Sequence, residues 1–102
     1  MLTQEKEREL QNFAREIRIQ TIRQIGIRGF GHIGGCMSIA DLLSVLYGED
    51  MKYDPQNPSW EGRDWLVCSK GHAGPAIYAA LALKGFFPME WMETLNQPGT
   101  NL

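Results

Sequence analysis

The chain has 102 residues, of which 43% are hydrophobic and 22% charged, an ordinary globular composition within the size of one domain. Ten Lys and Arg against twelve Asp and Glu leave a net charge of −2, so no strong positive field attracts a phosphate backbone, and we expect no nucleic-acid partner. No window approaches the roughly 20 apolar residues that cross a bilayer, and no signal-like stretch opens the chain, so we expect no membrane segment. Two cysteines in unlike contexts suit a reducing compartment, and we therefore expect a cytoplasmic protein.

The first predicted element is one amphipathic helix over residues 3–26. Apolar positions recur there with helical spacing, and Gly26 stands where a helix can stop. At 1.5 Å per residue the helix would be about 35 Å long, so its apolar stripe needs a neighbour to pack against. The stripe consists of Leu10, Phe13, Ala14, Ile17, Thr21, Ile22 and Ile25.

A glycine-rich loop is predicted over residues 26–35, because five glycines in ten residues suit neither a helix nor a strand. Residues 38–41 (SIAD) then have the pattern of a capping box, which predicts a short helix that ends near Gly48. The apolar residues of this helix, within 42–46, are interpreted as core.

The second half of the chain alternates connections and short elements. Residues 50–64 are predicted to form a surface connection, and the apolar run 65–68 (WLVC) a short buried strand. Pro75 in a first turn and Gly85 as a terminator predict a helix, and a last short helix is expected near Pro88. The apolar residues of these two helices are Ile77, Ala80, Leu81, Leu83, Trp91, Met92 and Leu95.

The single predicted strand decides the fold class. One strand cannot form a sheet, and parallel strands that are buried on both faces need neighbours. Either residues 65–68 are not a strand and the fold is wholly helical, or residues outside these 102 complete the sheet. We favour the second interpretation, an α/β fold that is mostly helical with one or a few parallel strands, and we treat residues 1–102 as one unit.

The two histidines are the candidate functional residues. His32 and His72 lie in glycine-containing segments that each precede a predicted helix, where backbone N–H groups can meet an anion. The segment around His72 also follows the predicted strand, a position at which α/β proteins bind ligands. A neutral imidazole can donate to a phosphate or an alkoxide and can exchange a proton near neutrality. The alternative is that each histidine only caps a helix or bonds a neighbouring carbonyl.

A structural zinc site is a further alternative. His32 with Cys36, and Cys68 with His72, could supply two nitrogens and two sulfurs to a zinc ion. The chain lacks the tight Cys-x-x-Cys knuckle that such sites usually contain, and Cys68 stands where a small buried thiol packs well. We therefore assign no metal ligand in this chain.

Two ordered motifs resemble the transketolase family. They are residues 31–41 (GHIGGCMSIAD) and residues 63–73 (RDWLVCSKGHA), and the similarity continues through residues 42–47 and 79–81. The likeness is greatest to the amino-terminal subunit of split transketolases, in which the diphosphate-binding and pyrimidine-binding halves of the enzyme are separate polypeptides. It implies that residues 1–102 are an amino-terminal fragment of the diphosphate-binding domain, with an incomplete thiamine-diphosphate-binding fold.

The resemblance also implies an activity and two residue roles. Transketolases are transferases of carbohydrate metabolism, in the pentose phosphate pathway, and they move a two-carbon ketol unit from a ketose phosphate to an aldose phosphate with thiamine diphosphate as cofactor. The matching histidines imply that His32 contacts the sugar substrate and that His72 contacts the diphosphate. A well-placed hydrogen bond to the reacting oxygens is commonly worth about 2.7 to 4 kcal/mol in such a transition state.

The family's remaining site residues have no counterpart in these 102 residues. The later glycine-rich segment, the Gly-Asp-Gly to Asn motif that holds Mg or Ca against the diphosphate, and the glutamate that activates the pyrimidine are missing. We therefore expect an oligomeric enzyme whose other parts are the remainder of the diphosphate-binding domain and a pyrimidine-binding subunit, and we expect this chain alone to be inactive. The alternative is a non-catalytic interaction or structural module.

Overall fold

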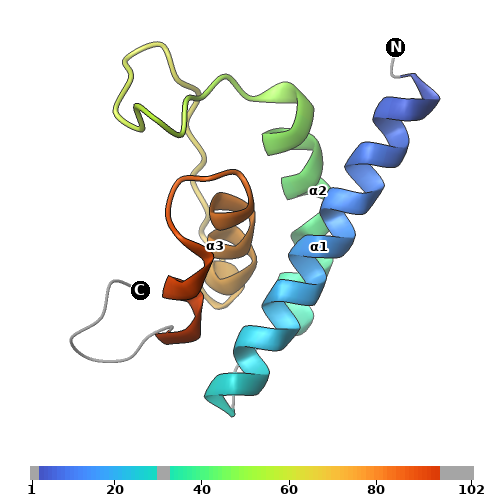
Figure 1. Ribbon diagram of the computed structural model, residues 1–102, viewed down its shortest axis with the longest axis vertical. Coiled ribbons are helices and arrows are strands. Elements are labelled where there is room, and N and C mark those ends of the chain that lie inside the picture. The colour runs from blue at the N-terminus through green and yellow to red at the C-terminus, as the bar shows by residue number, and fades with distance from the viewer. Residues whose placement is uncertain (1–2, 30–32, 95–102) are drawn as a thin grey trace.

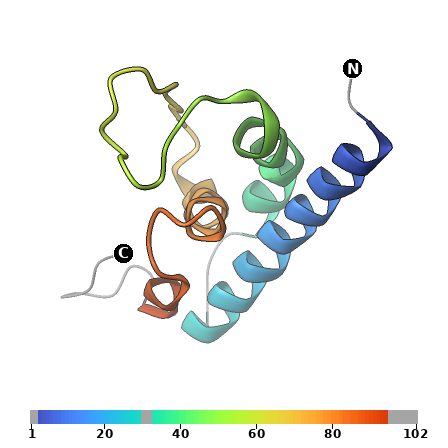
Figure 2. The same cartoon turned by 45° about the horizontal axis from the view of Figure 1, so that its top comes forward.

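The computed structural model describes residues 3–29 and 33–94, and this part of the chain is a helical assembly. Its elements are α1 (Gln4–Arg28), α2 (Gly34–Val45), the π-helical turn η1 (Leu46–Asp50), the 3₁₀ turn η2 (Gly71–Ala73), α3 (Gly74–Leu83) and the 3₁₀ helix η3 (Met89–Thr94). Helix α1 runs along the length of the molecule, and α2 and α3 lie on one side of it (Figure 1). The view in Figure 2 shows α3 between α2 and η3.

Helix α1 is the predicted amphipathic helix, with a later end than expected. Thr3 caps it, because the Thr3 hydroxyl oxygen accepts a hydrogen bond from the Lys6 N–H at 3.0 Å. The predicted stop at Gly26 is wrong: Gly26 lies inside the helix, and Gly29 ends it with a left-handed φ of 92° and an N–H that donates to the Ile25 carbonyl. Glycine suits the left-handed position because it has no Cβ.

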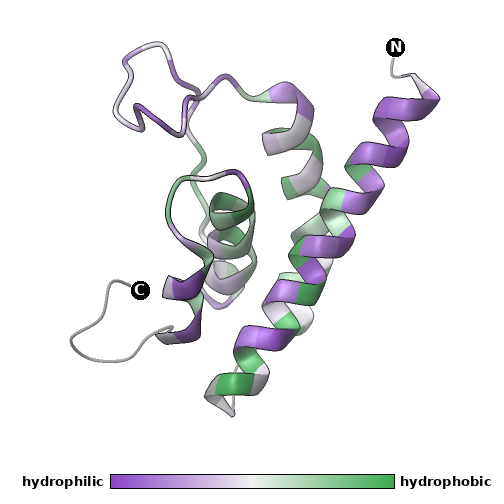
Figure 3. Ribbon diagram, viewed as in Figure 1, coloured by the Kyte–Doolittle hydropathy of each residue, from purple (hydrophilic) through white to green (hydrophobic). Residues whose placement is uncertain are grey.

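The buried face of α1 agrees with the predicted stripe at most positions. Leu10, Ala14, Ile17, Thr21 and Ile25 are buried, whereas Phe13 is half-buried and Ile22 is 50% exposed. Colouring by hydropathy shows hydrophilic and hydrophobic residues alternating along α1, while α3 is largely hydrophobic (Figure 3). Helix α1 therefore packs against the rest of the molecule along one face, and its other face is exposed.

Helix α2 begins earlier and its continuation ends later than the sequence pattern predicts. Its first residue is Gly34, inside the predicted loop, and Ser38 lies within the helix instead of capping it. At the other end the chain continues through Gly48 as η1 and leaves the helix at Met51. A Cβ on Gly48 would come within 2.5 Å of the Leu10 Cδ2 atom, so glycine is needed at this position for close packing against α1 and not for a helix stop.

The core is formed where α1, α2, α3 and η3 meet. Helix α3 contributes mainly small residues, which allow its backbone to lie close to its neighbours, and Met92 of η3 is fully buried against them. The predicted apolar face of α3 is partly wrong, since Ile77, Leu81 and Leu83 are half-buried and alanines take the central positions. Leu95 lies outside the described residues. The buried residues of α3 are Ala76, Ala79, Ala80 and Ala82.

The predicted buried strand at residues 65–68 does not form in the described part of the chain. Residues 63–70 run extended without strand pairing, and no strand occurs within residues 3–29 and 33–94. Trp65 is 73% exposed and Val67 82% exposed, while Leu66, which points the other way, packs against the core. The expectation of burial is wrong for this chain because the described residues supply no neighbouring strand to cover the outer side. The fold shown is mostly helical, and the parallel strands of the predicted α/β class are not seen.

The connection over residues 51–64 is the surface loop that the sequence predicts. It consists of turns, and it closes on itself where the Asp64 N–H donates to the Lys52 carbonyl and the Lys52 N–H donates to the Asp64 carboxylate, each at 2.7 Å. Among the described residues, no helix is both long and apolar enough to cross a membrane.

Candidate functional site

His72 lies in the short turn that leads into α3. The turn is closed by two backbone hydrogen bonds, from the Ala73 N–H to the Lys70 carbonyl at 3.0 Å and from the Gly74 N–H to the Gly71 carbonyl. Pro75 occupies the first turn of α3, as predicted, and that turn contains no acidic residue. The His72 side chain is exposed, whereas the next residue, Ala73, is fully buried and anchors the turn to the core.

The first turn of α2 packs against the turn that contains His72. The Cys36 thiol donates to the His72 carbonyl at 3.5 Å, and the Lys70 ammonium nitrogen donates to the Ser38 hydroxyl oxygen at 2.7 Å. These contacts join residues more than thirty positions apart in the sequence. The two glycine-containing motifs that the sequence singles out are therefore neighbours in space over their described residues.

Of the two predicted site residues, His72 can be placed and His32 cannot. His32 lies outside the described residues, as do Phe30 and Gly31, so its position relative to His72 is not described. The structure resumes at Ile33 and enters α2 at Gly34. The segment that follows His32 therefore leads directly into the helical turn that contacts His72.

Sequence patterns did not identify Ser38 and Lys70 as parts of this site. Ser38 carried a capping signal, and Lys70 followed the predicted strand as one residue of a motif. Their contact depends on the packing of α2 against η2, and no spacing rule along the chain connects positions 38 and 70. A contact of this kind needs a tertiary structure to become visible.

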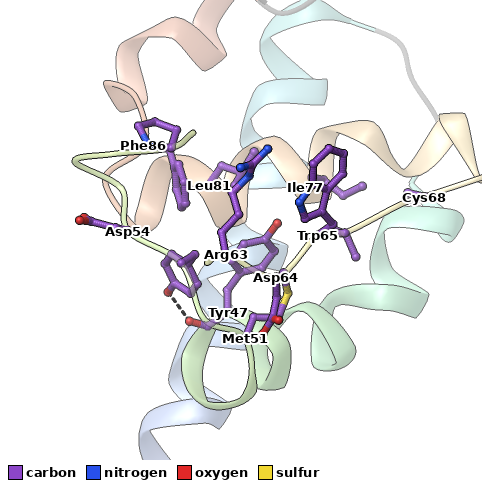
Figure 4. A pocket seen from close by; sticks show the side chains of 13 residues that line it. Tyr47, Met51, Asp54, Arg63, Asp64, Trp65, Cys68, Ile77, Leu81 and Phe86 are labelled. Atoms are coloured by element: carbon purple, nitrogen blue, oxygen red, sulfur yellow. Dashed lines mark hydrogen bonds between the residues drawn. The ribbon is translucent and has the colours of Figure 1, made fainter. Parts of the chain in front are cut away.

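A cavity of about 290 Å³ lies apart from the histidine, beneath the extended segment. Figure 4 shows Arg63, Trp65 and Phe86 around it, and a hydrogen bond from the Tyr53 hydroxyl to the Tyr47 carbonyl at its edge. The Arg63 guanidinium lies over the Trp65 ring, 4.6 Å from its centroid, and also donates to two loop carbonyls. His72 does not line this cavity.

Comparison with known proteins identifies the family of the chain. Residues 9–100 match the family described as transketolase, thiamine diphosphate binding domain. The chain belongs to this family. Thiamine diphosphate is the cofactor that the family's description names, and the matched residues include both motifs and all of the described helical structure except the first residues of α1.

Three relatives show how much of a transketolase the chain represents. It is 56% identical over 98 residues to the 6-deoxy-6-sulfo-D-fructose transketolase subunit of Clostridium sp. (strain MSTE9), which covers 96% of this chain and 36% of the relative. It is 39% identical over 99 residues to the transketolase of Homo sapiens, with 97% of this chain and 16% of the relative covered. It is 44% identical over 68 residues to transketolase 1 of Escherichia coli (strain K12), with 66% and 10% covered. The chain spans about a third of the first relative and less of the other two.

The described residues of this transketolase-family chain fit the anionic end of the cofactor. A Cβ placed on Gly71 would meet no heavy atom within 4 Å, so a ligand can approach that backbone closely. His72 is exposed beside it, and the first turn of α3 lacks a carboxylate that would repel a phosphate. These residues could hold a diphosphate group.

The cysteines of the transketolase-family chain differ in environment. Cys36 is fully buried, and burial raises the pKa of its thiol, although the Ala76 backbone and the Lys70 charge oppose that change. Cys68 is exposed, with its sulfur 3.4 Å from the Lys70 carbonyl oxygen, and both cysteines are free thiols. Within the described residues no group of three or more His, Cys, Asp or Glu side chains could hold a metal ion. The zinc alternative also requires His32, which the structure does not describe.

Proposed function

We propose that this chain contributes the start of the diphosphate-binding domain to a thiamine-diphosphate-dependent transketolase, which transfers a two-carbon ketol unit from a ketose phosphate to an aldose phosphate. The observation that carries the proposal is the packing of the α2 first turn against the turn containing His72, which brings the two family motifs together. Membership of the transketolase family supports the same reading.

Within this proposal the two histidines have separate tasks. His72 donates a hydrogen bond to the diphosphate and fixes the anionic end of the cofactor at the open backbone of Gly71. His32 donates to the oxygens of the donor sugar and stabilises the charge that develops there, an effect commonly worth about 2.7 to 4 kcal/mol. When bound, thiamine diphosphate supplies the nucleophilic carbon for the ketol transfer. A divalent cation, Mg or Ca, would neutralise charge on the diphosphate in the complete enzyme, and its ligands would come from outside these residues.

The partners are the remainder of the diphosphate-binding domain and a pyrimidine-binding subunit, in an oligomeric cytoplasmic enzyme. Support comes from residues 65–69, which form no strand pairing in the described part of the chain and in which Trp65 and Val67 are exposed. Unpaired backbone groups beside alternating apolar side chains are what a strand presents before its sheet is complete. In this proposal a strand from the remainder of the domain pairs with residues 65–68, so that residues 1–102 alone are inactive.

The same exposed segment favours one second candidate, a non-catalytic module that docks on a partner through Trp65 and Val67. Both candidates predict assembly at residues 65–68. Only the transketolase proposal predicts ketol transfer after assembly, and only that proposal gives His72 a function.

Reconstitution tests the proposal. The chain would be co-expressed with the part of the Clostridium relative that lies beyond the aligned region, together with a pyrimidine-binding transketolase subunit. Ketol transfer would be assayed with thiamine diphosphate and Mg²⁺, with a ketose phosphate as donor and, in parallel, 6-deoxy-6-sulfo-D-fructose, the sugar in that relative's name. An aldose phosphate serves as acceptor.

The expected result is transfer in the complete mixture and none without the chain or with the chain alone. The His72→Ala variant should raise the thiamine diphosphate concentration needed for half-maximal rate by roughly tenfold or more, as expected for loss of a hydrogen bond to a charged group. A folded assembly that transfers no ketol unit from either donor would reject the proposal in favour of the docking module.

A further inference from the structure

Ser38 uses its hydroxyl group in two directions. The oxygen accepts a hydrogen bond from the Lys70 ammonium at 2.7 Å, and the hydroxyl donates to the Gly35 carbonyl at 3.0 Å. Donation to Gly35 orients the hydroxyl, which leaves its lone pairs for Lys70. The Ser38 hydroxyl is thus oriented by a bond within α2 and binds Lys70, which precedes η2.

Gly35 provides the space in which the Lys70 side chain lies. A Cβ on Gly35 would come within 2.9 Å of the Lys70 Cε atom and 3.8 Å of the Nζ atom. A residue with a Cβ at this position would require the end of the Lys70 side chain to shift. Gly35 has no left-handed backbone that would itself require glycine, and the Lys70 side chain is the neighbour that a Cβ at Gly35 would meet.

Lys70 is also part of the turn that contains His72. Its carbonyl accepts from the Ala73 N–H, and this bond closes the turn around His72. The side chain of Lys70 is tied to α2, and the backbone of Lys70 is tied to the His72 turn. Displacing the Lys70 side chain should therefore shift the Lys70 backbone, whose carbonyl closes the turn around His72.

We infer that Gly35, Ser38 and Lys70 form a latch between α2 and η2 that positions His72 for the diphosphate. The role of the latch in cofactor binding rests on the proposed function. The latch contacts themselves lie within this chain and can be tested without it. Ser38 and Lys70 are positioning residues, because they act through the turn. Both side chains are exposed, so their contact adds little to global stability, and its effect should be local.

The first test is amide hydrogen exchange in the chain without cofactor. The reporter is the Ala73 amide, whose partner is the Lys70 carbonyl. Ser38→Ala, Lys70→Met and Gly35→Ala should each speed exchange at Ala73 by roughly three- to tenfold, the range expected for loss of one hydrogen bond. Ser38→Thr keeps the hydroxyl and should restore the wild-type rate. Ser59→Ala, at an exposed serine in the distant connection, is the matched control and should change nothing.

A double-mutant cycle separates the latch from independent surface effects. If Ser38 and Lys70 act through one contact, the Ser38→Ala/Lys70→Met variant should exchange no faster than the faster single variant. Multiplicative effects of the two substitutions, an unchanged Ala73 rate in either single variant, or an equal change in Ser59→Ala would each overturn the latch.

The second test uses the reconstituted enzyme and thiamine diphosphate. Ser38→Ala and Lys70→Met should raise the half-saturating cofactor concentration by roughly three- to tenfold and leave kcat at saturating cofactor within about twofold. An active enzyme whose cofactor dependence is unchanged in both variants would overturn the positioning role. If the assembly shows no ketol transfer even with wild-type sequence, the proposed function has failed, and the exchange experiment still decides the latch.

Discussion

Arg18 of α1 and Asp41 of α2 form a bidentate ion pair that joins the two helices. The Arg18 Nη1 atom donates to Asp41 Oδ1 at 3.1 Å, and Nη2 donates to Oδ2 at 3.0 Å. The same guanidinium donates to the Met37 carbonyl at 3.3 Å, in the turn of α2 that also carries Ser38. One arginine therefore fixes both the side chain and the backbone of the α2 segment next to the candidate site.

The Arg18–Asp41 pair predicts a pH dependence of stability. The hydrogen bond from Arg18 lowers the pKa of the Asp41 carboxyl below its ordinary value of 3.8, against a smaller opposing effect of burial. Because the folded-state pKa is the lower one, the pair stabilises the fold above the ordinary pKa, and this stabilisation is lost as the pH falls through the folded-state pKa.

Asp41→Asn should therefore lower the free energy of unfolding near pH 7 by about 0.5 to 1 kcal/mol, a small value because Asp41 is exposed. Urea unfolding of both proteins at several pH values measures the difference, which should vanish at a pH well below 3.8. Arg23→Gln, at another exposed arginine of α1, serves as the control and should show no such dependence. A constant difference between Asp41→Asn and wild type at all pH values would contradict the role of the ion pair.

Two glycine-to-alanine substitutions should have opposite effects on stability. Gly26 lies inside α1 with open space around it, so Gly26→Ala should stabilise the fold by about 0.5 to 1 kcal/mol through helix propensity. Gly48→Ala would press against buried Leu10 and the Phe13 ring, and crowding of a packed core typically costs about 1 to 3 kcal/mol, which exceeds the propensity gain. Thermal or urea unfolding measures both changes. Equal stabilisation by the two substitutions would show that α1 and η1 are not closely packed at Gly48.

Met92 should be the residue through which η3 stabilises the core. Its side chain is fully buried against α3, so Met92→Ala should cost about 2 to 5 kcal/mol in the free energy of unfolding. Met89, in the same 3₁₀ helix but only half-buried, is the matched control, and Met89→Ala should cost clearly less. If both substitutions have the same small effect, η3 does not dock as described.

The two thiols should differ in reactivity. Cys68 is exposed, whereas Cys36 is fully buried and burial raises the pKa of its thiol, so alkylation by iodoacetamide near neutral pH should label Cys68 at least about tenfold faster. Mass spectrometry of the labelled chain measures both rates, and Cys68→Ser removes the fast site as a control. In denaturant the two rates should converge. Rapid labelling of Cys36 in the folded chain would mean that α2 does not cover it.

A charge at position 67 should separate folding from assembly. Val67 is 82% exposed, so Val67→Lys should leave the stability of the isolated chain within about 0.5 kcal/mol of wild type. The same substitution should prevent association with the remainder of the domain, because a lysine would be buried against an apolar strand. Co-purification of the two parts measures the association. Ser59→Lys adds the same charge in the exposed connection and should leave assembly intact, and assembly that tolerates Val67→Lys would exclude a buried strand at residues 65–68.

Several features of the fold could be predicted from local patterns. The α1 stripe from Leu10 to Ile25, the first-turn Pro75 and the terminating Gly85, whose φ of 88° is left-handed, were all visible as spacing or residue type. Glycines caused most of the errors. Gly26, Gly34, Gly35 and Gly48 looked like breaks, yet all four lie in helical structure, because the other residues of each helix pack well enough to outweigh the modest helix penalty of one glycine.

By itself the sequence determined the helical periods, the segments that carry glycine and histidine, and, through two ordered motifs, the transketolase family. These depend on residue type and spacing along the chain, which are local quantities. Only the tertiary structure decided that Lys70 reaches Ser38 across Gly35, that Arg18 joins α1 to Asp41, and that Trp65 and Val67 face outward. Contacts between distant segments depend on how whole helices pack, and no pattern within one segment contains that information.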